Sequence, residues 1–539
     1  MARSCMPFME RSAARWLWRG ILASLSMLSV TASVAGASAQ DVSLNASARP
    51  NVVIVMADDL DVHSLNRMVE LGFMPKLKAR VIDNGTQFTN SFVTTSWCCP
   101  SRATLLTGRY SHNHRVLTNS RPLGGVHAFN DASTLATWLQ RAGYRTGLVG
   151  KYLNNYGSNV DSSTPVDDVG YIPPGWNDWQ ALHDDAGDGV RSFQMYGYRI
   201  NDNGRMVYHG TAAADYQTDV VARRAQQFIV ESDTYNDARP FFLLVTPTAP
   251  HVEQPSPVIS GCADSMWSET IRPAPRHAGS LPYAVQLPAP PNFNEPDVRD
   301  KPGWFQQLPP LTAQDVACLK RQYRDRLTSL RAIDDLVGRL FDTLQARAEL
   351  ANTVFIFTSD NGFFLGHHRL TDKVLGYEES IRVPLLIRAP GFVPQVTTRT
   401  ALNNDLAPTV MEFAGAAPGF VVDGRSLLPV LRNRWETNWR KRFLVEYLGT
   451  PEPENDPPRV PFSAVRSTEL SRTTPPHQIY VQWDDRLGSL EFYNLPADPY
   501  QLASRHNDAN WASVRNTMAG WLSQLRTCRE GSCQRVENQ

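Results

Sequence analysis

Four short apolar segments, each followed by polar residues, constrain the fold of this chain most strongly. They span residues 51–56, 146–150, 241–245 and 353–358. Continuous apolar runs of this length are typical of parallel strands that are buried on both faces. Helix-like stretches separate them, at 134–142, 216–231 and 311–348. This alternation predicts an α/β fold with a large, mixed but mostly parallel sheet that is flanked by helices on both faces.

The polar residues that follow these segments are the first indication of a functional site. In segment order they are Asp58 and Asp59, then Lys151, then His251, and finally Asp360 and Asn361. Ligands of such sheets bind outside the carboxyl ends of the strands. The topology therefore predicts that these residues lie together at one edge of the sheet.

Two of these groups offer only oxygen ligands. Asp58, Asp59, Asp360 and Asn361 suit a hard cation, Ca²⁺ or Mg²⁺, better than a thiophilic metal. Adjacent Asp residues at a strand end can both turn toward one ion. Asp-Asp and Asp-Asn-Gly are also common in ordinary turns, so either pair alone would be weak evidence for a metal site.

A third feature is the run Cys98-Cys99-Pro100-Ser101-Arg102, which continues to Gly108. Pro100 suits a first helical turn, and Gly108 can end a helix. We therefore expect the Cys98 thiol just ahead of a helix that Pro100 begins, where free N–H groups can hold an anion. Arg102 adds a fixed charge one turn later, suited to a tetrahedral oxyanion. The alternative is a vicinal cysteine pair that is merely buried or redox-sensitive.

This run resembles the signature of the formylglycine-dependent sulfatases. The resemblance implies an alkaline-phosphatase-like fold and oxidation of Cys98 to an aldehyde by a formylglycine-generating enzyme. In that family the aldehyde hydrate has two hydroxyls on one carbon, one to attack sulfur and one to expel sulfate afterwards. The resemblance also implies Ca²⁺ rather than Mg²⁺. Its implied ligands are Asp58, Asp59, the oxygenated Cys98 side chain, Asp360 and Asn361.

The resemblance implies roles for three further residues. Lys151 and Lys373 are similar to the two family lysines that contact sulfate, and His251 is similar to the His that protonates the leaving oxygen. The predicted catalytic set is Cys98, Arg102, Lys151, His251 and Lys373.

One departure from the family concerns the loop after Lys151. Many sulfatases have a His two or three residues after this lysine, where this chain has Leu153 and Asn154. His112, His114 and His368 are the candidates to replace it, although the first two could equally form a surface pair.

Three further motifs resemble the N-acetylglucosamine-6-sulfatase branch of the family, which includes the extracellular heparan endosulfatases. They are Tyr-Ser-His-Asn-His at 110–114, Gly-Lys-Tyr-Leu-Asn-Asn-Tyr-Gly at 150–157 and Pro-Pro-Gly-Trp at 173–176. That branch lacks the lysine-loop His too. The resemblance implies a sulfated carbohydrate substrate, such as N-acetylglucosamine 6-sulfate.

Two other functions compete with this hypothesis. One is a phosphate or phosphonate ester hydrolase of the same superfamily, but the His-rich two-zinc set of such phosphatases is not evident. The other is a non-catalytic glycan-binding protein on a sulfatase scaffold, which the intact set of reactive residues argues against.

Composition and the N-terminus indicate the compartment. Basic and acidic residues number 53 each, which gives no case for binding nucleic acid or an anionic membrane surface. Residues 1–39 have a basic start, an apolar run and an Ala-Ser-Ala end, as signal peptides do. We expect a protein exported to a periplasmic, extracellular or lysosomal space, with no stable membrane insertion after cleavage. A retained membrane anchor is the alternative.

The remaining predictions concern organisation. We expect a catalytic domain at 40–420, with an irregular insertion over 251–304, and a C-terminal subdomain and tail at 421–539. Short antiparallel strands at 443–447, 462–466, 478–483 and 490–495, followed by a helix at 509–526, would form this smaller subdomain. Export permits disulfides. Cys528 could pair with Cys533, and Cys262 with Cys318, but sequence alone leaves the connectivity open.

Overall fold

The computed structural model describes residues 49–158, 168–185, 189–234, 239–254, 256–263, 265, 267–451 and 459–539. The predicted signal peptide, residues 1–39, lies outside this range. Ten strands form the main sheet, in the order β13-β2-β12-β9-β1-β8-β4-β5-β6-β7. In that order they are Gln395–Thr397, Thr86–Phe88, Leu385–Arg388, Thr353–Ser359, Asn51–Ala57, Phe241–Thr246, Arg145–Lys151, Asp178–Leu182, Tyr198–Asp202 and Arg205–His209.

The four apolar segments are the neighbouring strands β9, β1, β8 and β4 at the centre of this sheet. Each pair of neighbours is parallel, with Ile54 of β1 between Ile356 of β9 and Leu244 of β8. Strands β12 and β6, which run antiparallel to both of their neighbours, make the sheet mixed. The prediction of a mostly parallel core within a mixed sheet is confirmed.

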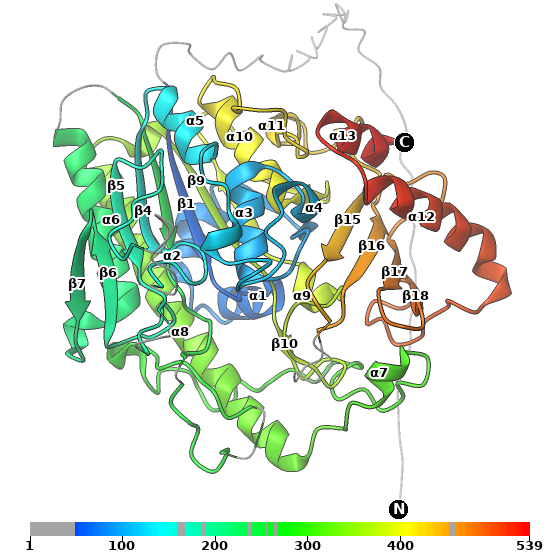
Figure 1. The fold of residues 1–539 in the computed structure, drawn as a ribbon. Helices are drawn as coiled ribbons and strands as arrows, with labels where there is room; N and C mark the ends of the chain where they lie inside the picture. The colour runs from blue at the N-terminus through cyan, green and yellow to red at the C-terminus, as the bar shows by residue number, and fades with distance from the viewer. Residues whose placement is uncertain are drawn as a thin grey trace, which may run out of the picture. The chain divides into compact units, whose positions relative to one another are not determined.

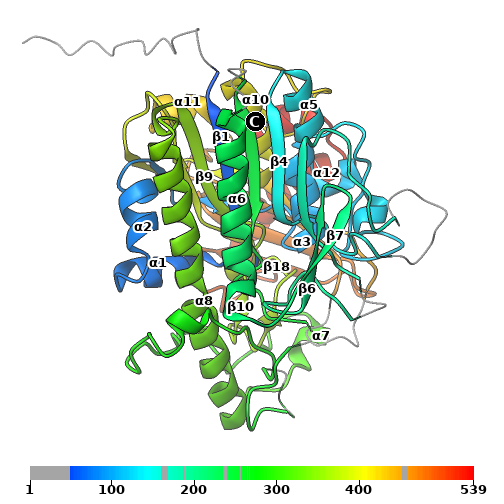
Figure 2. The same cartoon turned by 90° about the vertical axis from the view of Figure 1, so that its left-hand side faces the viewer.

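Helices cover both faces because side chains alternate along each central strand. Val53 and Val55 of β1 join the core that includes α1 (Val62–Glu70), α6 (Gln217–Thr234) and α8 (Ala313–Ala346). Val52 and Ile54 join the opposite core, which includes helices α3, α5, α10 and α11. These helices span Cys98–Thr107, Leu135–Arg141, Leu406–Phe413 and Leu428–Arg432. Figure 2 shows α6 and α8 lying side by side across one face of the sheet.

A second, four-stranded antiparallel sheet follows toward the C-terminus (Figure 1). Its strands are β15 (Arg442–Tyr447), β16 (Phe462–Ser467), β17 (Gln478–Trp483) and β18 (Leu490–Asn494). Helix α12 (Ala512–Leu525) packs on it and is followed by α13 (Gly531–Asn538), which the sequence analysis did not predict. The remaining short elements are α2 (Pro75–Leu77), β3 (Ser91–Phe92), α4 (Ser111–His114), α7 (Gly303–Gln306), β10 (Phe364–Leu365), β11 (Thr371–Asp372), α9 (Glu378–Ile381) and β14 (Ala401–Leu402).

Two disulfides have the predicted partners: Cys262 pairs with Cys318, and Cys528 with Cys533. One helix boundary was predicted wrongly. Helix α3 begins at Cys98, so Pro100 is its third residue, where the missing N–H still belongs to the unpaired first turn. None of the helices in the described part of the chain has the length and apolar character needed to cross a bilayer.

Candidate active site

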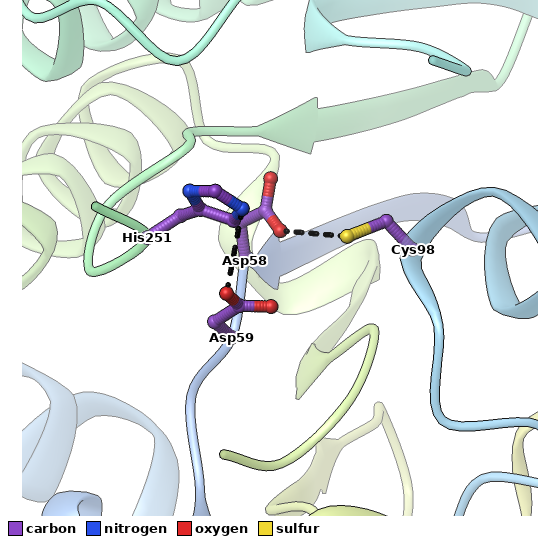
Figure 3. A group of neighbouring side chains, drawn as sticks. All are labelled: Asp58, Asp59, Cys98 and His251. Carbon is purple, nitrogen blue, oxygen red and sulfur yellow. Dashed lines mark hydrogen bonds and ion pairs between the residues drawn. The ribbon is translucent and has the colours of Figure 1, made fainter. Parts of the chain in front are cut away.

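The ends of the central strands bring together all nine residues that the sequence analysis selected. Asp58 and Asp59 follow β1, Lys151 ends β4, and His251 follows β8, while Asp360 and Asn361 follow β9. Figure 3 shows the two Asp residues beside His251, with Cys98 entering from the first residue of α3. Every one of the nine side chains is buried: Asp58, Asp59, Cys98, Arg102, Lys151, His251, Asp360, Asn361 and Lys373.

Cys98 lies between a carboxylate and an ammonium group. Its Sγ donates to Asp58 Oδ1 at 3.5 Å and accepts from Lys373 Nζ at 3.1 Å. Burial raises the pKa of the Cys98 thiol well above its usual range, although the two nearby lysines oppose this. The unmodified thiol is therefore neutral and a poor nucleophile.

Cys99 differs from its neighbour in direction and surroundings. Its side chain belongs to the apolar core on the α3 face of the sheet, and its backbone N–H donates to Asn119 Oδ1 at 2.8 Å. Burial raises the pKa of Cys99 to about 12. Of the two adjacent thiols, only Cys98 lies in the polar cluster.

Three buried cations neutralise the three carboxylates. Lys151 Nζ donates to Asp58 Oδ2 at 2.6 Å, and Lys373 Nζ donates to Asp59 Oδ1. Arg102 Nε donates to Asp360 Oδ2 at 2.9 Å. Burial opposes ionisation, but Lys151 and Arg102 hold the pKa of Asp58 below its usual range. The lysines and the arginine therefore present positive charge where an anionic group could bind.

The oxygen atoms of the cluster fit a hard divalent cation. Burial and repulsion by the charge of Asp58 together raise the pKa of Asp360 to about 6, although Arg102 opposes this shift. A cation between them would remove that repulsion. Asn361 directs Nδ2 at Asp59, 2.7 Å away, and its buried Oδ1 has no hydrogen-bond partner among the described residues. Rotating this amide would turn the oxygen toward the carboxylates, as a metal ligand requires.

His251 and Lys373 contact different oxygen atoms of the Asp59 carboxylate. The Nε2 of His251 is 3.4 Å from Asp59 Oδ2, and its Nδ1 donates to the backbone carbonyl of Val252 at 2.5 Å. Burial lowers the pKa of His251, and Asp59 offsets part of this shift. Because the carbonyl fixes Nδ1 as a donor, Nε2 is the nitrogen that can exchange a proton with a ligand. Each of four residues offers one possible metal ligand: Asp58, Asp59, Cys98 and His251. These four atoms all lie within 4.8 Å of one another.

The three other candidate histidines make their hydrogen bonds elsewhere. His112 bonds to Glu446 and to the carbonyl of Cys528, and His114 bonds to Thr104. His368 bonds to Glu295 at 2.6 Å. These contacts hold segments of the fold together, so none of the three replaces the missing lysine-loop His.

A polar cavity of about 710 Å³ opens onto the site. Asp59, His251 and Lys373 line it, together with Asn154 and Trp97. Val252, Gln254, Ser268 and Glu269, from the predicted irregular insertion, also line it. The cavity has the size and mixed polar and aromatic lining that suit a sugar-sized ligand.

The sequence analysis missed two residues that touch the site. Arg326 of α8 donates to the backbone carbonyls of Asp59 and Pro250, at 2.6 Å and 2.9 Å, and so joins the two loops. Phe193 stacks on His251, with ring centroids 4.2 Å apart. Neither lies in a distinctive motif, so no local signal pointed to them.

Comparison with known proteins identifies the family. The family model described as "Sulfatase" matches residues 50–416, and the one described as "N-sulphoglucosamine sulphohydrolase, C-terminal" matches residues 366–528. This chain belongs to the sulfatase family. It is therefore a sulfuric ester hydrolase, with the alkaline-phosphatase-like architecture that the resemblance implied.

Relatives of this sulfatase include enzymes of the predicted N-acetylglucosamine-6-sulfatase branch. N-acetylglucosamine-6-sulfatase of Capra hircus is 34% identical over 490 residues, covering 85% of this chain and 80% of the relative. The extracellular sulfatase SULF-1 homolog of Drosophila melanogaster is 34% identical over 412 residues, covering 75% of this chain and 33% of the relative. A protein solved in complex with its substrate, D-glucosamine-2-N,6-O-disulfate, shares the fold of this sulfatase. The TM-score is 0.70 at 23% identity, covering 91% of this chain and 99% of that one.

Proposed function

We propose that this sulfatase hydrolyses a sulfate ester of a carbohydrate, such as N-acetylglucosamine 6-sulfate, with a formylglycine derived from Cys98 and with bound Ca²⁺. The observation that carries the proposal is the position of Cys98. It begins α3 and lies between Asp58 and Lys373, in a cluster that borders a sugar-sized cavity. The activities named for the relatives support the choice of sugar.

The proposal includes two groups that this chain acquires. A formylglycine-generating enzyme would oxidise Cys98, and the hydrated aldehyde would supply two hydroxyls, one as the nucleophile toward sulfur and one that permits release of sulfate. Asp58, Asp59, Asp360, Asn361 and the modified residue would hold Ca²⁺, which supplies positive charge to the sulfate oxygens. We prefer Ca²⁺ because it accepts many protein oxygens, whereas Mg²⁺ usually retains several waters.

Residues of the chain itself would bind the sulfate group, hold the cluster in place and donate the proton. The ammonium groups of Lys151 and Lys373 bind sulfate oxygens, and Arg102 holds Asp360 and the carbonyl of Lys151, 2.8 Å away, in place. In its protonated form, His251 donates the Nε2 proton to the leaving sugar oxygen and keeps the proton on Nδ1. A sugar alkoxide is a poor leaving group, so this proton transfer lowers the barrier.

The proposal also assigns the chain an exported location and a division into parts. Residues 1–39 would direct export and be removed, 40–420 would form the catalytic domain, and 421–539 the C-terminal subdomain. Extracellular sulfatases among the relatives support the location.

The leaving group tests the role of His251. Because a nitrophenolate leaves without a proton, we expect His251→Ala to lose about 10²- to 10⁴-fold in turnover on N-acetylglucosamine 6-sulfate and far less on nitrophenyl sulfate. The measurement is kcat on both substrates. His506→Ala is the matched control, since the ring nitrogens of His506 bond to Ser504 and Asn507 in its own loop. Equal losses on both substrates would assign His251 to sulfate binding or to the fold instead.

A further inference from the structure

We propose that Phe193 is a positioning residue that sets the plane of the His251 imidazole. This inference rests on the proposed role of His251 as the proton donor. The two rings are stacked, with centroids 4.2 Å apart and planes inclined by 22°. Phe193 is only 2% exposed, and it lines the cavity beside His251.

The imidazole needs a second restraint besides its hydrogen bond. The bond from Nδ1 to the Val252 carbonyl fixes one point of the ring but leaves the ring free to tilt about that point. A flat aromatic face against the imidazole removes that freedom, so Nε2 keeps one direction. An aliphatic side chain offers no such plane.

Phe193 is itself held rigidly relative to the His251 loop. The side chain of Gln217, which is fully buried, donates to the carbonyls of Ser192 and Gln194 on either side of Phe193, at 2.7 Å and 2.8 Å. Its Oε1 accepts from Thr248, three residues before His251, at 2.6 Å. One amide therefore ties the segment that carries Phe193 to the loop that carries His251.

A second buried group makes the same connection from the other end of the loop. Glu253, also fully buried, accepts from the backbone N–H of Met195 at 2.9 Å. Glu253 follows His251 by two residues, so both sides of the histidine are tied to the segment 192–195. The stacked pair is thus built into the fold by two independent polar contacts.

The same ring also contacts a proposed sulfate ligand. Lys151 Nζ lies 4.3 Å from the centroid of Phe193, within the range of a cation–π contact. A loss that acts through Lys151 would weaken sulfate binding for every substrate, whereas a loss that acts through His251 depends on the leaving group. The two routes are therefore separable by experiment.

The test compares Phe193→Leu with Phe193→Tyr on the two substrates used for His251. We expect Phe193→Leu to lose about 10- to 100-fold in kcat on N-acetylglucosamine 6-sulfate, as small misplacements of a catalytic group do, and less than about threefold on nitrophenyl sulfate. Phe193→Tyr, which keeps the ring, should restore kcat on the sugar to within about threefold of the parent. Equal losses on both substrates, or no rescue by Tyr, would overturn the inference.

Two further variants keep the test decisive. Phe228→Leu is the matched control, because Phe228 of α6 also packs on an aromatic ring and beside a cation, Arg145, but lies in the apolar core. It should lose equally on both substrates. Gln217→Met loosens the segment without removing the ring, so we expect the same selective loss, smaller in size, even if Phe193→Leu fails to fold.

Running His251→Ala in parallel separates the two claims. Selective loss in His251→Ala without selective loss in Phe193→Leu and Gln217→Met overturns the positioning role alone. No selectivity in His251→Ala overturns the proton-donor role, and the positioning role with it.

Discussion

At the scale of single residues, Arg102 is the cation that links two of the buried carboxylates. It is 1% exposed, donates to Asp360 at 2.9 Å, and lies 3.4 Å from Asp58. Removing one partner of a buried ion pair leaves an uncompensated charge, at a cost of about 3–5 kcal/mol. We therefore expect Arg102→Met to lower the free energy of unfolding by about that amount, and Arg102→Lys to recover part of the stability but little of the turnover. Denaturant unfolding measures the first effect.

The control for Arg102 is an arginine in an exposed pair. Arg67 and Glu70 are 3.9 Å apart, with side chains 42% and 68% exposed. Arg67→Met should change the free energy of unfolding by less than about 1 kcal/mol. An Arg102→Met protein as stable as Arg67→Met would contradict the view that these charges depend on one another.

The residues of the candidate site could be predicted where chemistry and motif coincide. Asp58 and Cys98 stand in distinctive local patterns, and Lys373 was selected through the resemblance to the family. Phe193 and Gln217 stand in no such pattern, because their importance comes from partners that are distant in sequence. His112, one of three candidates for the lysine-loop role, makes its observed bonds outside the polar cluster, to Glu446 and to the carbonyl of Cys528.

At the scale of secondary-structure elements, the strands that could be predicted most clearly from the sequence are fully buried ones. Strands β1, β8 and β9 are buried at every position, so their apolar runs were plain. Strand β7 lies at the edge and is exposed or half-buried at every position, and β2 spans only three residues, so neither gave a clear pattern. The start of α3 was misplaced because Pro100 suits any position of the first turn, not the first position alone.

At the scale of the whole molecule, residues that are far apart in the sequence together form the candidate site. Loops that follow β1, β4, β8 and β9, together with α3 and the Lys373 loop, place three carboxylates and three cations in one buried cluster. Folding therefore fixes the charges before a ligand arrives, which is the preorganisation that stabilises a developing charge. Because the proposed Ca²⁺ ligands come together only when the chain folds, the site exists only in the native state.

Calcium should accordingly stabilise the folded protein. A ligand that binds only the native state adds about 2.7 kcal/mol at a hundredfold excess over its Kd, so Ca²⁺ should raise the thermal unfolding midpoint and chelation should lower it. We expect a smaller shift with Mg²⁺. Asp59→Asn should abolish the calcium shift. Asp61→Asn is the matched control: Asp61 is buried nearby but caps α1, so this variant should be less stable yet still respond to calcium. An unchanged calcium response in Asp59→Asn would rule out the proposed ligand set.

The central claim is that Cys98, and not Cys99, becomes the aldehyde. Trypsin cleaves after Arg80 and Arg102 and releases peptide 81–102, which contains both cysteines. Fragment-ion mass spectrometry of this peptide from active protein, after alkylation of thiols, tests the claim most directly. We predict an aldehyde in place of CH₂SH at Cys98 and an alkylated thiol at Cys99. Active protein with two alkylated cysteines, or with the aldehyde at Cys99, would contradict it.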